Sequence, residues 1–223
     1  MVFVAAIQAK RRRERLYVDG LCSSCGKNPF IAPSKRCAGC LGRENELYHR
    51  ARRNVIDHYG GSCVRCHEKL YNLLTIDHID GGGNAHRKST TPNVARWLQS
   101  HGYPTGYQVL CWNHNYLKYL TTRSISARIE SLRNEIFSIY GKSCSCCQID
   151  DRRLLTIDHP GGNGAEERRS VGVSSWYRFY EWLKASGFPS GYDVLCFSCN
   201  SGRETNGGIC PHVGGKTYVM RCP

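Results

Sequence analysis

The sequence contains no apolar run of the length that a membrane-spanning helix needs, which is about 18 residues. It also lacks the usual features of a secretory signal, because the apolar run from Val2 to Ile7 is short and precedes a basic cluster instead of following one. We therefore expect no membrane partner and an intracellular, cytoplasmic location. Cysteines in such a compartment stay reduced, so the 14 cysteines are expected to bind metal and not to form disulfides.

Acidic residues are scarce beside basic ones. The chain has 31 Lys and Arg against 18 Asp and Glu, which gives a net charge of +13 and a pI of about 9.2. An excess of positive charge is typical of proteins that bind a polyanion, most simply nucleic acid. A basic surface that is only solvated explains the charge equally well, so the motifs have to separate the two interpretations.

The hexapeptide Leu-Leu-Thr-Ile-Asp-His occurs twice, as Leu73 to His78 and as Leu154 to His159. Each copy begins as an apolar run with β-branched residues, which predicts a buried strand, and ends on an acid and an imidazole followed by glycines. Strict alternation along a strand would send Asp and His to opposite faces, so a site built from both requires the strand to end or bulge there.

The flanking residues repeat as well. The segment 59–66 reappears as 140–147 at the offset of the hexapeptide, and 102–115 matches 187–200 after a longer intervening segment. A duplicated unit is therefore the central feature of the chain. We expect an N-terminal module over residues 1–42, a first repeat over 43–121 and a second repeat with a C-terminal tail over 122–223.

Helices are expected beside the predicted strands. The segment Ile7 to Val18 forms a basic helix that carries Arg11, Arg12, Arg13 and Arg15, and Arg50 to Arg53 lie in a second basic helix; both are expected to contact phosphates. Apolar spacing and helix-stop residues predict the helices Ile7–Val18, Gly42–His58, Asn93–His101, Ser126–Tyr140 and Ser174–Ser186.

Three sets of cysteine and histidine have the spacing of structural zinc sites. Each Cys-x-x-Cys or Cys-x-x-His pair forms a tight turn that directs two ligands at one ion, and two pairs complete a tetrahedron. Repeats of about 70 to 80 residues have small hydrophobic cores and usually need such metal sites or disulfides for stability. The sets are Cys22, Cys25, Cys37 and Cys40; Cys63, Cys66, Cys111 and His114; and Cys144, Cys147, Cys196 and Cys199. His114 aligns with Cys199, an exchange that zinc tolerates and a disulfide does not.

Three cysteines remain outside these sets: Cys146, Cys210 and Cys222. Cys210 with His212 and Cys222 forms a partial metal site that lacks an obvious fourth ligand. The alternative is that these side chains simply pack.

The Asp-His pairs carry groups suited to catalysis. Asp77, His78 and Asn115 form one set, and Asp158, His159 and Asn200 form the other. Oxygen ligands from Asp and Asn suit Mg²⁺ or another divalent cation, and an imidazole with a pKa of about 6.5 suits a general base for water. Together these groups are suited to phosphodiester hydrolysis.

The order Cys-x-x-Cys, Asp-His, Cys-x-x-Cys/His-Asn resembles the phage recombination endonuclease VII group of the HNH, or His-Me finger, nucleases. The resemblance covers roughly 59–116 and 140–212. It implies two small α+β domains of the zinc-held, treble-clef-like ββα-metal type, after an N-terminal zinc-ribbon-like module. It also implies that His78 and His159 are general bases, that Asp77 with Asn115 and Asp158 with Asn200 bind the divalent cation, and that the protein works in a bacterial or phage-infected cytoplasm.

The two repeats differ near the expected site. The first has His86 and Arg87, which are candidates for binding the scissile phosphate, whereas the second has Glu166 and Glu167 there. The expected function is a metal-dependent DNA endonuclease whose two repeats act as an intramolecular pseudo-dimer on double-stranded or branched DNA. The alternative is a non-catalytic, zinc-containing protein that binds nucleic acid within a large nucleoprotein assembly.

Overall fold

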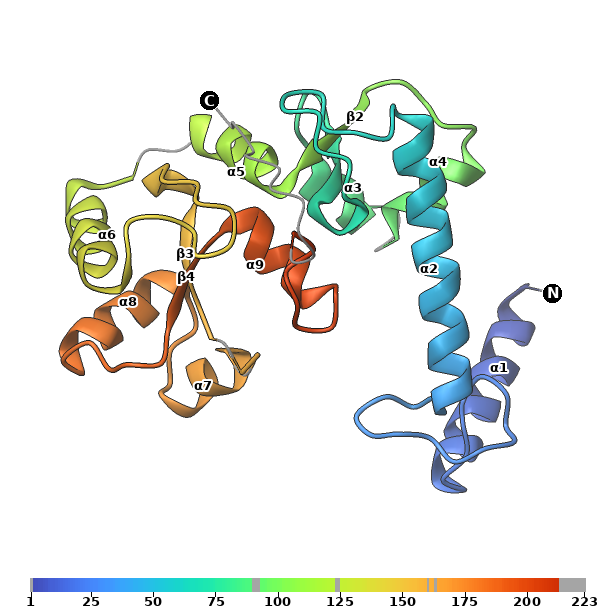
Figure 1. Ribbon diagram of the computed structural model, residues 1–223. Coiled ribbons are helices and arrows are strands. Elements are labelled where there is room, and N and C mark those ends of the chain that lie inside the picture. The colour runs from blue at the N-terminus through green and yellow to red at the C-terminus, as the bar shows by residue number, and fades with distance from the viewer. Residues whose placement is uncertain (1, 90–92, 123–124, 160, 163, 213–223) are drawn as a thin grey trace. The chain divides into compact units, whose positions relative to one another are not determined.

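The computed structural model describes residues 2–89, 93–122, 125–159, 161–162 and 164–212 (Figure 1). It shows a small α+β protein with two separate two-stranded sheets. The helices are α1 (Val2–Val18), α2 (Ala38–His58), α3 (Gly83–Ser89), α4 (Val94–Ser100), α5 (Trp112–Thr121), α6 (Ala127–Tyr140), α7 (Gly164–Ser170), α8 (Trp176–Ala185) and α9 (Phe197–Glu204). No helix in the described part of the chain is long and apolar enough to cross a membrane.

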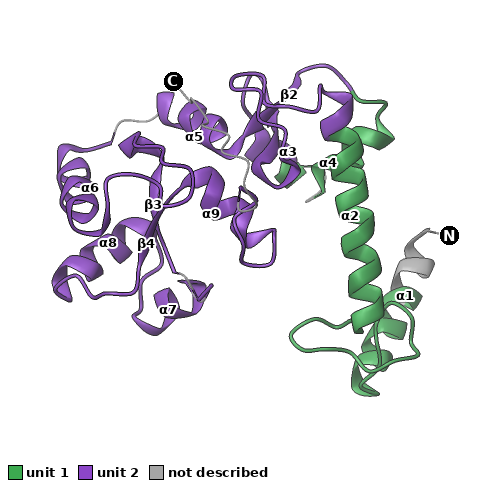
Figure 2. Cartoon of the chain, viewed as in Figure 1, with its two compact units in different colours: residues 1–55, 87–103 green, residues 56–86, 104–223 purple. Residues whose placement is uncertain are grey.

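The chain divides into two compact units, which Figure 2 distinguishes by colour. Unit 1 comprises residues 1–55 and 87–103, and it contains α1, most of α2, and α4. Unit 2 comprises residues 56–86 and 104–223. Both sheets lie in unit 2, so the strands of the two repeats belong to one compact body.

Each repeat has the chain order strand, two helices, strand, helix. Strand β1 (Leu74–His78) pairs antiparallel with β2 (Tyr107–Cys111), and β3 (Leu155–Asp158) pairs antiparallel with β4 (Asp193–Cys196). Helix α5 follows β2 directly and contacts both strands of its sheet, and α9 does the same after β4. The duplicated sequence therefore folds twice into one arrangement.

The two predicted strands are confirmed with small shifts at their ends. Leu73 and Leu154 close short 3₁₀ turns, η1 (Tyr71–Leu73) and η2 (Arg152–Leu154), and the strands begin at the next residue. Strand β3 ends at Asp158, so His159 lies just beyond it, and β1 ends at His78. Strand β3 thus ends between Asp158 and His159, whereas Asp77 and His78 both lie within β1, opposite Gln108 and Tyr107.

The predicted helices are also present. Asn93, Ser126 and Ser175 each cap a helix, because their side-chain oxygen accepts a hydrogen bond from the backbone N–H three residues later. Helix α2 begins at Ala38, before the expected start at Gly42, so that Cys40 lies in its first turn.

Each sheet packs on apolar side chains of its own repeat. In the second repeat Ile136, Phe137, Leu154, Leu155 and Leu183 are almost wholly buried. The smaller core of the first repeat in unit 2 contains Ile56, Leu74, Val109 and Leu110.

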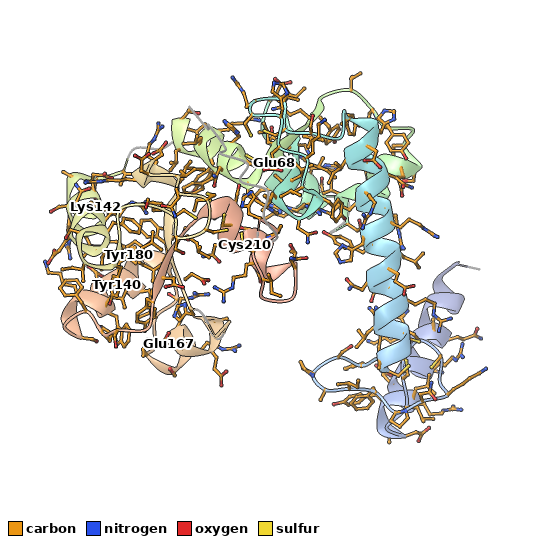
Figure 3. All side chains as sticks on the ribbon, viewed as in Figure 1. Glu68, Tyr140, Lys142, Glu167, Tyr180 and Cys210 are labelled. Atoms are coloured by element: carbon orange, nitrogen blue, oxygen red, sulfur yellow. The ribbon has the colours of Figure 1, made fainter. Side chains whose placement is uncertain are left out.

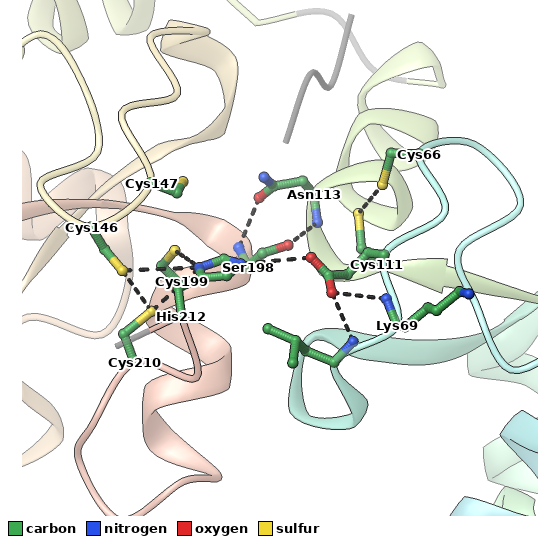
Figure 4. Close-up of polar contacts among 12 residues, drawn as sticks. Cys66, Lys69, Cys111, Asn113, Cys146, Cys147, Ser198, Cys199, Cys210 and His212 are labelled. Carbon is green, nitrogen blue, oxygen red and sulfur yellow. Dashed lines mark hydrogen bonds and ion pairs between the residues drawn. The ribbon is translucent and has the colours of Figure 1, made fainter. Parts of the chain in front are cut away.

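The two repeats contact each other through residues at equivalent positions. The backbone N–H of Asn113 donates to Ser198 Oγ at 2.9 Å, and the backbone N–H of Ser198 donates to Asn113 Oδ1 at 2.7 Å (Figure 4). Both residues are fully buried. An exchange of contacts between equivalent positions is typical of a two-fold interface, so the repeats pack as a pseudo-symmetric pair within unit 2.

Candidate functional site

Four clusters of cysteine and histidine could hold a metal ion, and in each the ligand atoms all lie within 4.8 Å of one another. Three clusters are the sets expected from the spacing. The fourth joins Cys146, Cys199, Cys210 and His212, so the residues that looked like a partial site gain two cysteine partners. Every cysteine in the described part of the chain is a free thiol, and Cys222 lies outside it. These donor sets fit zinc.

The turns that present the ligands are the same in both repeats. After the first cysteine pair, the N–H of His67 donates to Cys63 O and the N–H of Gln148 donates to Cys144 O. Both His67 and Gln148 adopt positive φ angles, 59° and 64°, which tighten these turns.

The second ligand pair lies at a helix start. Cys111 and Cys196 cap α5 and α9, and each Sγ accepts the backbone N–H of the ligand three residues later at 3.4 Å. Each helix therefore brings its cap cysteine and the ligand three residues later, His114 or Cys199, to the same metal cluster.

The sulfur atoms of the second repeat are closely packed. Hydrogen bonds from the side chains of Cys147, Cys196 and Cys199 lower the pKa of Cys144, whereas the same sulfur contacts raise the pKa values of Cys196 and Cys199. Several thiolates cannot coexist there without a counter-charge, which a divalent cation would supply.

The aspartate of each Asp-His pair forms an ion pair with a cation on the helix that follows the second strand of its sheet, α5 or α9. Asp77 Oδ2 accepts from Lys118 Nζ at 2.7 Å and from Gln108 Nε2 at 2.7 Å. Asp158 Oδ2 pairs with Arg203, which is equivalent to Lys118. Burial nevertheless raises the pKa of Asp158. Sequence reasoning missed both cations, although each stands three residues after the asparagine of its set.

The histidines take part in matching networks. In the first repeat His78 Nε2 lies 2.8 Å from His86 Nδ1, and Tyr107 Oη lies 3.4 Å from the same atom. In the second repeat Glu167 takes the place of His86. Its Oε2 pairs with His159 Nε2, and its Oε1 accepts from Tyr192 Oη at 2.6 Å.

Glu167 lies against the ring of His159, with its Oε2 at ion-pair distance from Nε2. The acid in the second repeat, labelled in Figure 3, therefore faces the histidine of its own site.

A glycine packs against each of these rings. A Cβ atom added to Gly83 would lie 3.1 Å from His78 Nδ1, and one added to Gly164 would lie 2.6 Å from His159 Nδ1. These glycines open helices α3 and α7. The glycine-rich sequences after the strands thus allow a helix start to lie directly against the imidazole.

A cleft of about 390 Å³ in the second repeat brings the expected residues together. Asp158, His159 and Asn200 all line it, together with Arg168 and Arg203. Asn200 Nδ2 donates to Thr156 Oγ1 at 2.9 Å, which fixes the amide within the cleft.

The corresponding residues of the first repeat lie on equivalent elements. Asp77 and His78 end β1, and Asn115 lies half-buried on α5. Lys118 Nζ joins the first two, because it donates to Asp77 Oδ2 and to the backbone oxygen of His78.

The donor set for a catalytic magnesium ion does not fit as it stands. Both aspartates expected to bind the ion are already paired with a cation, Asp77 with Lys118 and Asp158 with Arg203. A divalent cation would have to displace that cation from the carboxylate.

The residues expected to bind nucleic acid are mostly exposed. Arg11, Arg12, Arg13 and Arg15 lie on α1, and Arg87 lies on α3. His86 is half-buried, because it contacts His78. Its place in that contact favours a role beside the histidine over a role as a surface residue.

Comparison of the chain with models of protein families, with curated proteins and with solved structures finds no match. The interpretation of the site therefore depends on its own geometry.

Proposed function

We propose that this protein is a DNA endonuclease of the HNH, or His-Me finger, type, with His78 and His159 as general bases. The observation that carries the proposal is the cleft of the second repeat, where Asp158, His159 and Asn200 meet two arginines. The first repeat offers the same elements in the same order. Acid, imidazole, amide and cations in one cleft suit hydrolysis of a phosphodiester.

The residues of the second repeat define the steps. The imidazole of His159 takes a proton from water, and the water oxygen bonds to phosphorus as the bond to the leaving ester oxygen breaks. The leaving oxygen takes a proton from solvent. Arg168 and Arg203 line the cleft where negative charge grows on the phosphate. The carboxylate of Glu167 lies beside Nε2 and stabilises the imidazolium that forms.

The divalent cation expected from the resemblance belongs to this proposal. Asp158 and Asn200 are the residues that would hold it, and Arg203, which pairs with Asp158, would have to release that carboxylate. When bound, it would supply further stabilisation of charge at the phosphate.

The positive charge of the chain supports DNA as the substrate. The net charge is +13, and the exposed arginines of α1 are suited to contacts with backbone phosphates, which carry little sequence information. Two pseudo-symmetric sites in one chain suit a substrate with two strands, such as duplex or branched DNA.

Plasmid cleavage tests the proposal. Wild type is incubated with supercoiled plasmid and Mg²⁺, with an EDTA control, beside His78→Ala, His159→Ala and the double variant, each checked for zinc content. We expect wild type to cut and the double variant to lose cutting while it keeps its zinc. Equal cutting by wild type and the double variant would overturn the assignment of the histidines.

A second candidate function is non-catalytic binding of nucleic acid, and one observation favours it. The ion pairs Lys118–Asp77 and Arg203–Asp158 occupy the acids that a catalytic ion would use. A protein of this kind would bind DNA with a strong dependence on salt. It would not cut DNA, whichever divalent metal is added. Binding assays over a salt series, run beside the plasmid assay, separate the two functions.

A further inference from the structure

We propose that the second repeat holds two zinc ions bridged by the thiolate of Cys199. Cys199 belongs to two clusters at once, the expected set with Cys144, Cys147 and Cys196 and a further set with Cys146, Cys210 and His212. Seven side chains thus surround two neighbouring ion positions. A thiolate sulfur has enough lone pairs to bind two zinc ions.

The distances in the second set suit a zinc ion. With Zn–S bonds of about 2.3 Å and Zn–N bonds of about 2.0 Å, the edges of a tetrahedral site measure roughly 3.5 to 3.8 Å. His212 Nδ1 lies 3.3 Å from Cys199 Sγ, 3.6 Å from Cys210 Sγ and 3.9 Å from Cys146 Sγ (Figure 4). Cys146 Sγ and Cys210 Sγ are 2.9 Å apart, which is shorter than such an edge. That contact makes a disulfide between them the competing arrangement to exclude.

A buried carboxylate supports His212 as a ligand. Glu68 Oε2 lies 3.6 Å from His212 Nε2, and both side chains are almost wholly buried. Glu68 Oε1 accepts the backbone N–H groups of Lys69 and Leu70, so the carboxylate is fixed in place. A carboxylate behind the second ring nitrogen commonly accompanies a zinc-bound histidine, and Glu68 takes that position here at a distance longer than a hydrogen bond.

The difference between the repeats supports the bridge. The first repeat has His114 at the position of Cys199 and an exposed Arg65 at the position of Cys146. A neutral imidazole binds one zinc ion through one nitrogen and cannot bridge two. The first repeat thus lacks both the extra cysteine and a ligand able to bridge. The second repeat has both, as Cys146 and Cys199.

The second ion would join three parts of unit 2. Cys146 lies in the first ligand turn of the second repeat, and Cys210 with His212 follows α9. Glu68, in the first repeat, contacts His212. The site therefore fastens the segment after α9 to both repeats, next to the buried contact between Asn113 and Ser198.

Metal content of the full chain, purified with reductant, tests the proposal. We expect four zinc ions per chain in wild type. Cys146→Ser and His212→Ala should each contain three, because they leave Cys144, Cys147, Cys196 and Cys199 in place. Cys199→His, which copies the first repeat, should also contain three. Wild type with three zinc ions would overturn the proposal, and a reductant-free thiol count lower by two would identify the disulfide.

Cadmium substitution tests the bridge itself. In chain loaded with ¹¹³Cd, two of the resonances should show coupling to each other through the shared sulfur, and Cys146→Ser should remove that coupling together with one resonance. Four metal ions without any coupling between them would show separate sites and would overturn the bridge. These readouts do not depend on DNA cleavage, so they stand apart from the proposed nuclease activity.

Discussion

At the scale of single residues, Gly164 shows how little space surrounds the histidine of the second repeat. An alanine Cβ there would lie 2.6 Å from His159 Nδ1, and neither Gly164 nor its counterpart Gly83 has a positive φ, so the effect of a substitution is steric. We expect Gly164→Ala to destabilise the chain by about 1 to 3 kcal/mol and to displace the ring. Gly83→Ala should have a smaller effect, because its Cβ would lie 3.1 Å from His78 Nδ1.

Chemical unfolding measures both variants. Gly42→Ala is the matched control, because nothing lies within 4 Å of a Cβ at that helical position and alanine favours a helix there. Equal stabilities for Gly164→Ala and Gly42→Ala would contradict the close packing against the imidazole.

Glu167 is expected to position His159. Glu167→Gln keeps the size of the side chain but removes the negative charge that lies beside Nε2 of His159 and stabilises the imidazolium. On the proposed function, we expect this change to slow cutting by the second repeat by about tenfold to a hundredfold. The rate is measured in a His78→Ala background, so that only the second repeat cuts.

Glu167→Asp serves as the conservative variant in that assay, because it restores the charge and should recover part of the rate. If the parent chain and both Glu167 variants cut at one rate, the positioning role is wrong.

At the scale of elements, helices α5 and α9 join the repeats through Asn113 and Ser198. Each side chain accepts the backbone N–H of the other residue in a fully buried place. We expect Asn113→Ala and Ser198→Ala each to destabilise unit 2 by about 1 to 3 kcal/mol, because each leaves a buried N–H without its acceptor.

The double variant completes a cycle for this pair. The two losses should not add, since one exchange of hydrogen bonds supports both. Urea unfolding of the wild type and the three variants measures the coupling. If the two losses in free energy of unfolding simply add, the two hydrogen bonds act independently and the contact between the repeats is not cooperative.

How far the sequence predicts these elements depends on the kind of signal. The strands β1 and β3 and the helices α2, α6 and α8 follow from apolar patterns and capping residues, because each buries one face locally. Helices α3 and α7 were not predicted, because each begins at a glycine and its sequence contains no apolar repeat. The strands β2 and β4 and the helices after them were expected from the resemblance alone.

The candidate site shows the same division. The spacing of Cys and His gave three of the four clusters, because a tight turn brings neighbouring ligands together. The fourth needs Cys146 and Cys210 to meet across 64 positions, which only tertiary packing decides. Lys118 and Arg203 were missed for a similar reason, since a cation on a helix looks solvated until the strand beside it is placed.

At the scale of the whole molecule, the pseudo-symmetric repeats lead to a prediction about the product of cleavage. If each repeat cuts one strand, wild type should convert supercoiled plasmid to linear DNA, whereas His78→Ala or His159→Ala should stop at the nicked circle. A short reaction at limiting enzyme, analysed on an agarose gel, separates the three forms. The double variant, which should leave the plasmid supercoiled, is the control for contaminating nuclease.

The two repeats need not cut at equal rates, because His86 in one corresponds to Glu167 in the other. Unequal nicking by the two single variants would measure that difference directly. Linear product at the wild-type rate from either single variant would show that one repeat cuts both strands in turn. The second repeat or the first would then serve mainly to hold the DNA, and the pseudo-symmetry would reflect packing and binding instead of paired catalysis.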